Sequence, residues 1–147
     1  MKRLSSALLL LSALTALSAT AAETPPVRLA NPLQGTDSTG GFSHGNTFPA
    51  IALPFPMNVW APYTEPAKNT FYYQYRKSQI RGIRQTHQPS PWIGDYANFS
   101  LMPVFGKLVV KEDDRASDFS HASEVANAAY YKVHLDTPGP TAEVTPT

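Results

Sequence analysis

Proline limits the fold of this chain more than any other feature of its sequence. All 14 prolines of the 147 residues lie beyond residue 23, at about twice the usual ~5% frequency. Proline lacks a backbone N–H and disrupts both helix interiors and central strands. The apolar stretch 48–60, for example, is interrupted by Pro49, Pro54 and Pro56. The sequence therefore predicts short strands at edges or bulges rather than long helices.

The first 22 residues have the composition of a secretory signal peptide. Lys2 and Arg3 precede an apolar run at 7–17, and small residues follow at 18–22. This run of about 11 residues is far shorter than the ~20 that a membrane span requires. We expect cleavage after Ala21 or Ala22, which leaves residues 23–147 as an exported domain, periplasmic or secreted, with no membrane anchor.

The charge of the mature chain is close to neutral. Removal of Lys2 and Arg3 leaves 10 basic against 11 acidic residues, so the formal charge falls from +1 to −1. A near-neutral domain has no general field that attracts nucleic acid or anionic lipid. Because the chain has no cysteine, disulfides and thiolate metal sites are excluded. About 125 residues correspond to one domain.

The pattern of apolar residues predicts an all-β fold, an antiparallel β-sandwich of six to eight short strands. Residues 130–136 alternate well, with Tyr131, Val133 and Leu135 on one face. Helical propensity is concentrated in residues 123–129, too few to support a helical fold. The other expected strands are residues 71–76, a hairpin of 99–105 and 107–111 around Gly106, and 141–147. Since the last of these has no partner after it, we expect an incomplete sheet, part of a longer domain.

Two loops carry the candidate chemistry. Residues 35–47 are rich in glycine, which lets backbone N–H groups approach a ligand, although composition alone favours a surface connection between strands. Residues 85–96 concentrate His87, Gln88, Trp92 and Asp95 around two prolines. An indole beside hydrogen-bonding groups suits a sugar, whose C–H face stacks on aromatic rings while its hydroxyls need polar partners. Alternatively, Trp92 fills the core and Asp95 forms a turn.

The spacing of the histidine and acidic residues predicts no catalytic or metal-binding group. The four histidines, at 44, 87, 121 and 134, include no HxH or HxxxH pair, so we expect no metal site in this chain. The acidic run at 112–114 consists of adjacent residues, which cannot easily straddle a glycosidic bond with groups roughly 5–10 Å apart. We interpret it as a solvated turn.

Three groups of segments, taken in order, resemble glycoside hydrolase family 92. The first is 31–36 (NPLQGT), 45–50 (GNTFPA) and 53–57 (LPFPM). The second is 82–96 (GIRQTHQPSPWIGDY) and 101–103 (LMP). The third is 119–121 (FSH), 130–133 (YYKV) and 141–145 (TAEVT). Any one segment is a weak signal, whereas the ordered set, spread over residues 30–147, is specific.

The resemblance implies an exo-acting α-mannosidase, mostly α-1,2 specific, that inverts the anomeric configuration and requires calcium. In this family an N-terminal β-sandwich packs against a larger (α/α)6 barrel, from which the acid, the base and the calcium ligands chiefly come. The sandwich contributes loops that complete the mannose pocket. The resemblance therefore implies that this chain, by itself, lacks the catalytic carboxylates and the calcium site.

Carried over position by position, the resemblance makes Gly41, Phe42, His87, Trp92 and Asp95 the candidates for contact with an α-mannoside glycan. The sequence departs from the family where Asn46 replaces a histidine of many members. It departs again at 84–90 (RQTHQPS), where many members have SHTHLSG. Two other functions stay open for the chain alone, a carbohydrate-binding module and a scaffold that docks a partner domain.

Overall fold

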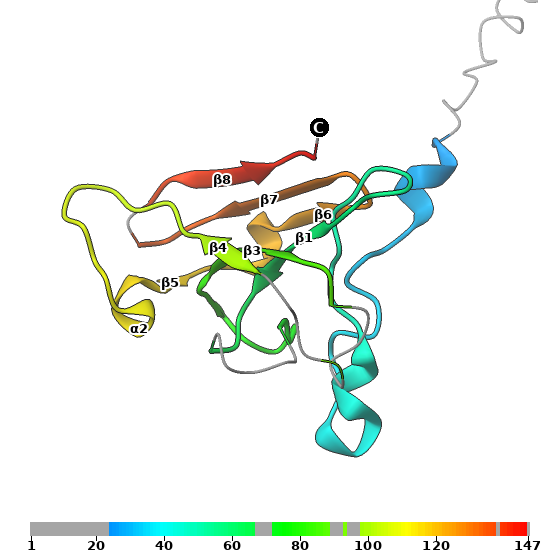
Figure 1. The fold of residues 1–147 in the computed structure, drawn as a ribbon, viewed down its shortest axis with the longest axis horizontal. Coiled ribbons are helices and arrows are strands. Elements are labelled where there is room, and N and C mark those ends of the chain that lie inside the picture. Colours follow the sequence, from blue (N-terminus) through cyan, green and yellow to red (C-terminus); the bar gives the residue numbers. More distant parts are fainter. Residues whose placement is uncertain (1–23, 67–71, 89–92, 94–97, 138, 147) are drawn as a thin grey trace, which may run out of the picture.

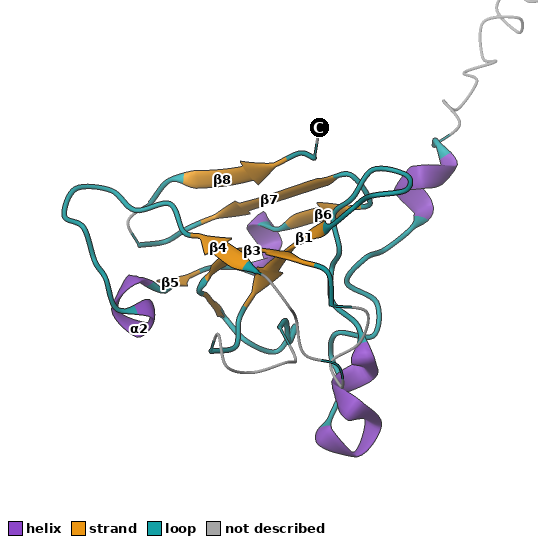
Figure 2. Cartoon of the chain, viewed as in Figure 1, coloured by secondary structure: helices purple, strands orange, loops and turns teal. Residues whose placement is uncertain are grey.

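The computed structural model describes residues 24–66, 72–88, 93, 98–137 and 139–146. Within them the chain consists mostly of short antiparallel strands with few helical turns, which confirms the all-β prediction (Figures 1 and 2). The strands are β1 Val59–Tyr63, β2 Gln79–Ile80, β3 Gly82–Thr86, β4 Phe99–Leu101, β5 Ser117–Asp118, β6 Val125–Asn127, β7 Tyr130–His134 and β8 Thr141–Val144. The helical turns are η2 Pro26–Leu29, η3 Gly40–Asn46, α2 Glu112–Arg115 and η4 His121–Ser123.

These strands form three antiparallel sheets with the orders β1-β3-β4, β2-β5 and β6-β7-β8. In the last sheet Val133 faces Ala142 across the β7–β8 pair. The predicted alternation along β7 is confirmed, because Tyr131, Val133 and Leu135 are at most 1% exposed whereas His134 faces solvent. Figure 1 shows β6, β7 and β8 side by side above β1, β3 and β4.

One apolar core connects the three sheets. It combines Ile83 of β3, Ile80 of β2 and Val133 of β7, and Trp60 of β1 packs against it from one side. The buried members of this core are Ile51, Ile80, Ile83, Phe119, Tyr131, Val133, Leu135 and Ala142. No helix of the described ranges is long and apolar enough to cross a membrane.

Two expected strands are wrong. Residues 72–76 are buried at their start but irregular, because their backbone bonds to two different segments: Thr64 donates to the Tyr72 carbonyl and Tyr75 donates to that of Thr36. Of the expected hairpin of 99–105 and 107–111, residues Phe99–Leu101 form strand β4, whereas residues 102–111 form no strand and leave Leu108 exposed. Pro103 removes a donor that a ladder there would use.

Two short segments also adopt structure that their sequence did not predict. The acidic residues 112–114 open the helical turn α2, where negative charge suits the N-terminal end and Arg81 pairs with Glu112 and Asp113. Residues 125–127, inside the segment of helical propensity, form strand β6 along β7. Pairing with the sheet overrides a weak local preference.

A buried carboxylate links three segments of the fold. The Glu124 side chain is 1% exposed and accepts hydrogen bonds from Tyr73 at 2.9 Å and from Tyr131 at 2.6 Å. His121 Nδ1 lies 2.6 Å from the same carboxylate, and its ring stacks on Tyr75 at 3.9 Å. Burial, together with the charge and hydrogen bonds of Glu124, raises the pKa of Tyr73 and of Tyr131 above the ordinary value of about 10.

These raised pKa values predict a loss of stability in base. A group whose pKa is higher in the folded state than in the unfolded state stabilises the fold fully at pH values below its unfolded pKa, here near 10. This stabilisation is lost as the pH rises further. Above about pH 10 we expect the free energy of unfolding to fall by about 1.4 kcal/mol per pH unit for each tyrosine. Denaturant unfolding at pH 8–11.5 measures this slope, which should be shallower in Tyr73→Phe than in the control Tyr75→Phe. Equal slopes in the two variants would contradict the assignment.

Candidate functional site

The first predicted loop has an unusual backbone. η3 contains Gly41 and Phe42, and the next four residues all have positive φ: Ser43 at 53°, His44 at 50°, Gly45 at 77° and Asn46 at 51°. Three of these are not glycine, and such residues adopt left-handed conformations rarely. The backbone N–H groups of Phe42 and His44 both donate to the Thr39 carbonyl, at 2.9 and 3.0 Å. The loop is therefore a compact turn that leaves the Phe42 ring 78% exposed.

Close backbone packing at two glycines holds this loop in place. A Cβ added to Gly45 would lie 1.8 Å from the Gly35 carbonyl oxygen, and one added to Gly35 would lie 2.9 Å from Thr47 Oγ1. Neither position accepts a side chain without displacement of the backbone or of Thr47. The buried Thr36, next in the chain, donates to the Leu33 carbonyl through N and Oγ1.

The second loop leaves the sheet at the end of β3. His87 is exposed there and Gln88 is buried. Gln88 donates its backbone N–H to Thr86 Oγ1 at 3.0 Å, which fixes the direction of the chain where the loop begins. The other two candidates of this loop, Trp92 and Asp95, lie outside the described residues.

A layer of buried polar side chains underlies the start of this loop. All five residues of β3 are buried, among them Arg84 at 3% exposure, Gln85 and Thr86. The Arg84 guanidinium carbon lies 4.5 Å from the centre of the Tyr63 ring and 4.3 Å from that of Tyr72. Two cation–π contacts away from water stabilise this charge strongly.

Tyr72 connects the two loops. Its ring contacts that of Phe48, just after the first loop, with centroids 5.8 Å apart. Its hydroxyl lies 3.4 Å from Thr86 Oγ1, just before His87. Its carbonyl accepts the backbone N–H of Thr64 at 2.9 Å and that of Glu65 at 3.3 Å. The structure thus brings the end of one predicted loop and the start of the other onto one buried tyrosine.

This arrangement is suited to binding. Phe42 offers an exposed aromatic face and His87 an exposed imidazole, and His87 lies between the buried Thr86 and Gln88. Two acidic side chains are engaged in ion pairs, Asp37 of the first loop with Arg76 at 3.0 Å and Glu65 with Lys77 at 3.5 Å. Within the described ranges no three of the His, Asp and Glu side chains gather in a group that could hold a metal ion. Since Ca²⁺ takes six to eight oxygen ligands, these residues alone do not fit it.

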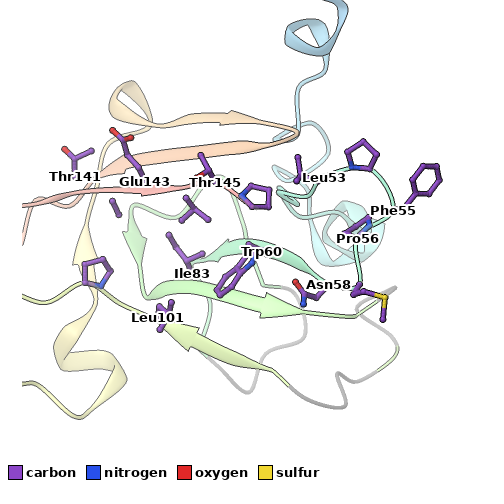
Figure 3. A pocket seen from close by; sticks show the side chains of 16 residues that line it. Leu53, Phe55, Pro56, Asn58, Trp60, Ile83, Leu101, Thr141, Glu143 and Thr145 are labelled. Carbon is purple, nitrogen blue, oxygen red and sulfur yellow. The ribbon is translucent and has the colours of Figure 1, made fainter.

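A groove of about 930 Å³ lies elsewhere on the molecule, between the β1-β3-β4 sheet and β8. Figure 3 shows Trp60 and Ile83 between the two walls, with Thr141, Glu143 and Thr145 along β8 and beyond it. The end of the groove is a proline-rich turn that carries Leu53, Phe55 and Met57. Most residues that line it are apolar, but polar atoms supply almost half of its exposed surface, so the lining does not single out one class of occupant.

Sequence reasoning missed both the polar layer and the groove. The signal for the layer is the run Arg84, Gln85, Thr86 inside a short strand, where polar residues do not alternate with apolar ones. Such a run departs from the alternation expected of a strand that buries one apolar face. The groove depends on how distant strands pack, which no local pattern encodes.

The contact between the glycines predicts a severe effect of one methyl group. Gly45→Ala should lower the free energy of unfolding by about 1–3 kcal/mol, because the added carbon meets the Gly35 carbonyl and φ is positive. Denaturant unfolding measures the change. Gly40→Ala is the matched control, because a Cβ there makes ordinary contact at 3.7 Å. Similar stability of the two variants would rule out the tight packing.

The tyrosine–arginine–tyrosine stack predicts a second effect. Arg84→Met keeps much of the buried volume but removes the charge between Tyr63 and Tyr72, so the free energy of unfolding should fall by about 2 kcal/mol or more. Arg28→Met, at an exposed arginine of η2, should change it by less than about 0.5 kcal/mol. Thermal and denaturant unfolding test both predictions. An Arg84→Met variant with an unchanged free energy of unfolding would show that the stack does not contribute to stability.

Comparison with known proteins gives the relatives of this structure. Residues 29–147 match the family profile "Glycosyl hydrolase family 92 N-terminal domain". A solved structure of the inverting mannosidase BT2199 from Bacteroides thetaiotaomicron VPI-5482 is 44% identical, with a TM-score of 0.75 over 85% of this chain and 17% of that one. The α-mannosidase BT3965 from Bacteroides thetaiotaomicron, solved with mannoimidazole, is 28% identical, with a TM-score of 0.69 over 82% of this chain and 16% of that one.

A further structure, the family hydrolase ccman5, shares the fold at 23% identity with a TM-score of 0.53. None of the curated proteins compared with the chain matches it. The chain thus spans about a sixth of the length of the solved relatives.

Proposed function

This chain belongs to glycosyl hydrolase family 92, as its N-terminal domain, and on that premise we propose that it completes the substrate pocket of a longer exo-α-mannosidase that inverts configuration. The observation that carries the proposal is the 44% identity to an inverting mannosidase over 85% of this chain. In the proposal the catalytic acid and base come from an (α/α)6 barrel outside residues 1–147. The chain alone is then inactive.

We assign the sugar-facing role to the two loops. Gly41 and Phe42 lie on the first, His87 begins the second, and Trp92 and Asp95 follow on it. Aromatic faces at Phe42 and Trp92 would stack on the pyranose, while His87 and Asp95 would bond its hydroxyls. The support for this assignment is the exposure of Phe42 and His87, together with the family resemblance.

The finer parts of the proposal rest on the resemblance and on the sequence. We expect α-1,2-linked mannosides as substrates and a calcium ion whose ligands belong to the barrel. The departures from the family pattern at 84–90 include His87, so they are the first place to seek a different linkage preference. The signal-like residues 1–22 support export to the periplasm or beyond.

The direct test is hydrolysis by the parent enzyme that contains this chain. With α-1,2-mannobiose we expect β-mannose as the first product, which proton NMR detects before mutarotation. We also expect a chelator to abolish the activity. The 147-residue chain should release no mannose under the same conditions. Absence of mannosidase activity in the parent would reject the proposal, and tight mannoside binding by the chain alone would favour a carbohydrate-binding module instead.

Substitution of the sugar-facing residues gives a sharper prediction. His87→Ala and Trp92→Ala in the parent should each lower kcat/KM about 10- to 100-fold, because the loss of one hydrogen bond or stacking contact costs about 1.4–2.8 kcal/mol. The unfolding temperature should stay the same. His134→Ala is the control, since His134 is exposed on β7 and lies in neither loop. Unchanged kinetics in either variant would remove that residue from the pocket.

A further inference from the structure

The His121 ring has a hydrogen-bond acceptor at each of its two nitrogens. Nδ1 lies 2.6 Å from a carboxylate oxygen of Glu124, and Nε2 lies within hydrogen-bond distance of the backbone carbonyl of Tyr75. A neutral imidazole carries one N–H, so it can donate to one of these oxygens and would turn a lone pair toward the other. The imidazolium ion carries two N–H groups and satisfies both acceptors. The geometry therefore favours a charged ring.

The partner of Nδ1 also favours a positive charge at this position. The Glu124 side chain is 1% exposed, and the hydroxyls of Tyr73 and Tyr131 donate to it in addition to the contact from His121. Hydrogen bonds donated to a carboxylate favour its ionised form, and a buried negative charge needs a positive partner. Within the described ranges, Glu124 is the charged group that contacts the ring. The other titratable groups in these contacts are Tyr73 and Tyr131, on the carboxylate, and Tyr75, on the ring.

Two aromatic rings hold the imidazole in this orientation. The Tyr75 ring stacks on it with centroids 3.9 Å apart and 15° between the planes. The Phe119 ring, which belongs to the core cluster, meets it nearly edge-on at 4.9 Å and 80°. An aromatic face attracts a cation, so the stack also suits the charged form of His121. Rotation of the imidazole away from its two acceptors would cost both ring contacts.

The segment that accepts from Nε2 is joined to the start of the first loop at two points. Tyr75 donates its backbone N–H to the carbonyl of Thr36 at 3.0 Å, and Arg76 pairs with Asp37 at 3.0 Å. Thr36 follows Gly35, whose carbonyl oxygen packs closely against Gly45 of the same loop. Tyr75 thus contacts His121 through its carbonyl and the first loop through its N–H.

We propose that His121 is a positioning residue for the first loop, bound as an imidazolium between the Glu124 carboxylate and the Tyr75 carbonyl. In this role it contacts neither sugar nor reacting atoms, and it fixes residues 75–76, against which the loop begins. If the ring loses one of its two protons as the pH rises, one acceptor loses its donor, so the loop should become less ordered in base. The inference rests on the proposed function only for its effect on mannosides, because the contacts involve no substrate.

Nitrogen-15 NMR of the histidine rings tests the charge without any substitution. In the 147-residue chain at pH 7, both ring nitrogens of His121 should carry a proton. Glu124→Gln should remove one of these protons, because the negative partner is lost. His134, exposed on β7, is the internal control, and its ring spectrum should be the same in both proteins. A neutral His121 ring in the unsubstituted chain would overturn the inference.

Hydrogen–deuterium exchange tests whether the ring positions the loop. His121→Phe keeps an aromatic ring beside Tyr75 but removes both donors. The backbone amides of Tyr75 and His44 should then exchange at least about 10-fold faster, because their hydrogen bonds hold the start and the middle of the first loop. The amide of Trp60, which donates to a carbonyl elsewhere in the fold, should exchange as before.

A matched control and a second variant complete this test. His134→Phe, at an exposed histidine of β7, should alter the exchange of neither loop amide. If His121→Phe does not fold, the isosteric Glu124→Gln takes its place, and the same two amides should exchange faster. Unchanged exchange of the Tyr75 and His44 amides in the variant that folds would overturn the positioning role.

Kinetics of the parent enzyme give the functional consequence. His121→Phe should raise KM for α-mannosides about 3- to 10-fold and change kcat by less than about twofold, because the loop binds the sugar while the barrel supplies the acid and base. His134→Phe should change neither constant. A lower kcat with an unchanged KM would contradict a role in positioning the sugar loop.

The remaining outcomes separate this inference from the proposed function. A parent that hydrolyses no mannoside, in a protein whose His121 ring is charged and whose loop amides exchange faster in the variant, would uphold the positioning role and reject the mannosidase. An active mannosidase with a neutral His121 ring, or with unchanged loop exchange, would do the reverse.

Discussion

The Glu124 carboxylate is the interaction on which most of the other contacts depend. It lies in an environment that excludes water, so its charge has to be satisfied by Tyr73, Tyr131 and His121. Tyr73 belongs to an irregular segment and Tyr131 to β7, and the carboxylate therefore joins parts of the chain that no sheet joins. Tyr75, which stacks on His121, donates its backbone N–H to the carbonyl of Thr36 at the start of the first loop. A chain of contacts thus links the buried carboxylate to that loop.

The sequence predicted the class of fold, because alternation and proline placement are local signals. Tyr131, Val133 and Leu135 were recognised as buried from their spacing alone. It did not predict the irregular path of residues 72–76, where the side chains are strand-like but the backbone bonds to Thr64 and Thr36 in turn. Those bonds join residues far apart in the sequence, and no window of neighbouring residues contains them.

In the candidate site, too, one part could be predicted from the sequence and another could not. Composition and the family pattern pointed to the residues that would face a sugar, among them Phe42 and His87, since such residues carry recognisable chemistry. The supports behind them were missed. Arg84 between two tyrosines and Tyr72 between two loops are recognisable only once β1 and β3 are paired. A binding residue is defined by its own chemistry, whereas a supporting residue is defined by its neighbours.

The contact between Gly35 and Gly45 has a consequence for how such a pocket can diversify. The first loop is held by main-chain packing and by hydrogen bonds to the Thr39 carbonyl, and only the two glycines are required for their lack of a side chain. The exposed Phe42 ring contributes little to this frame. Residues at its position can therefore be exchanged while the loop keeps its shape, which separates the evolution of sugar preference from the evolution of stability.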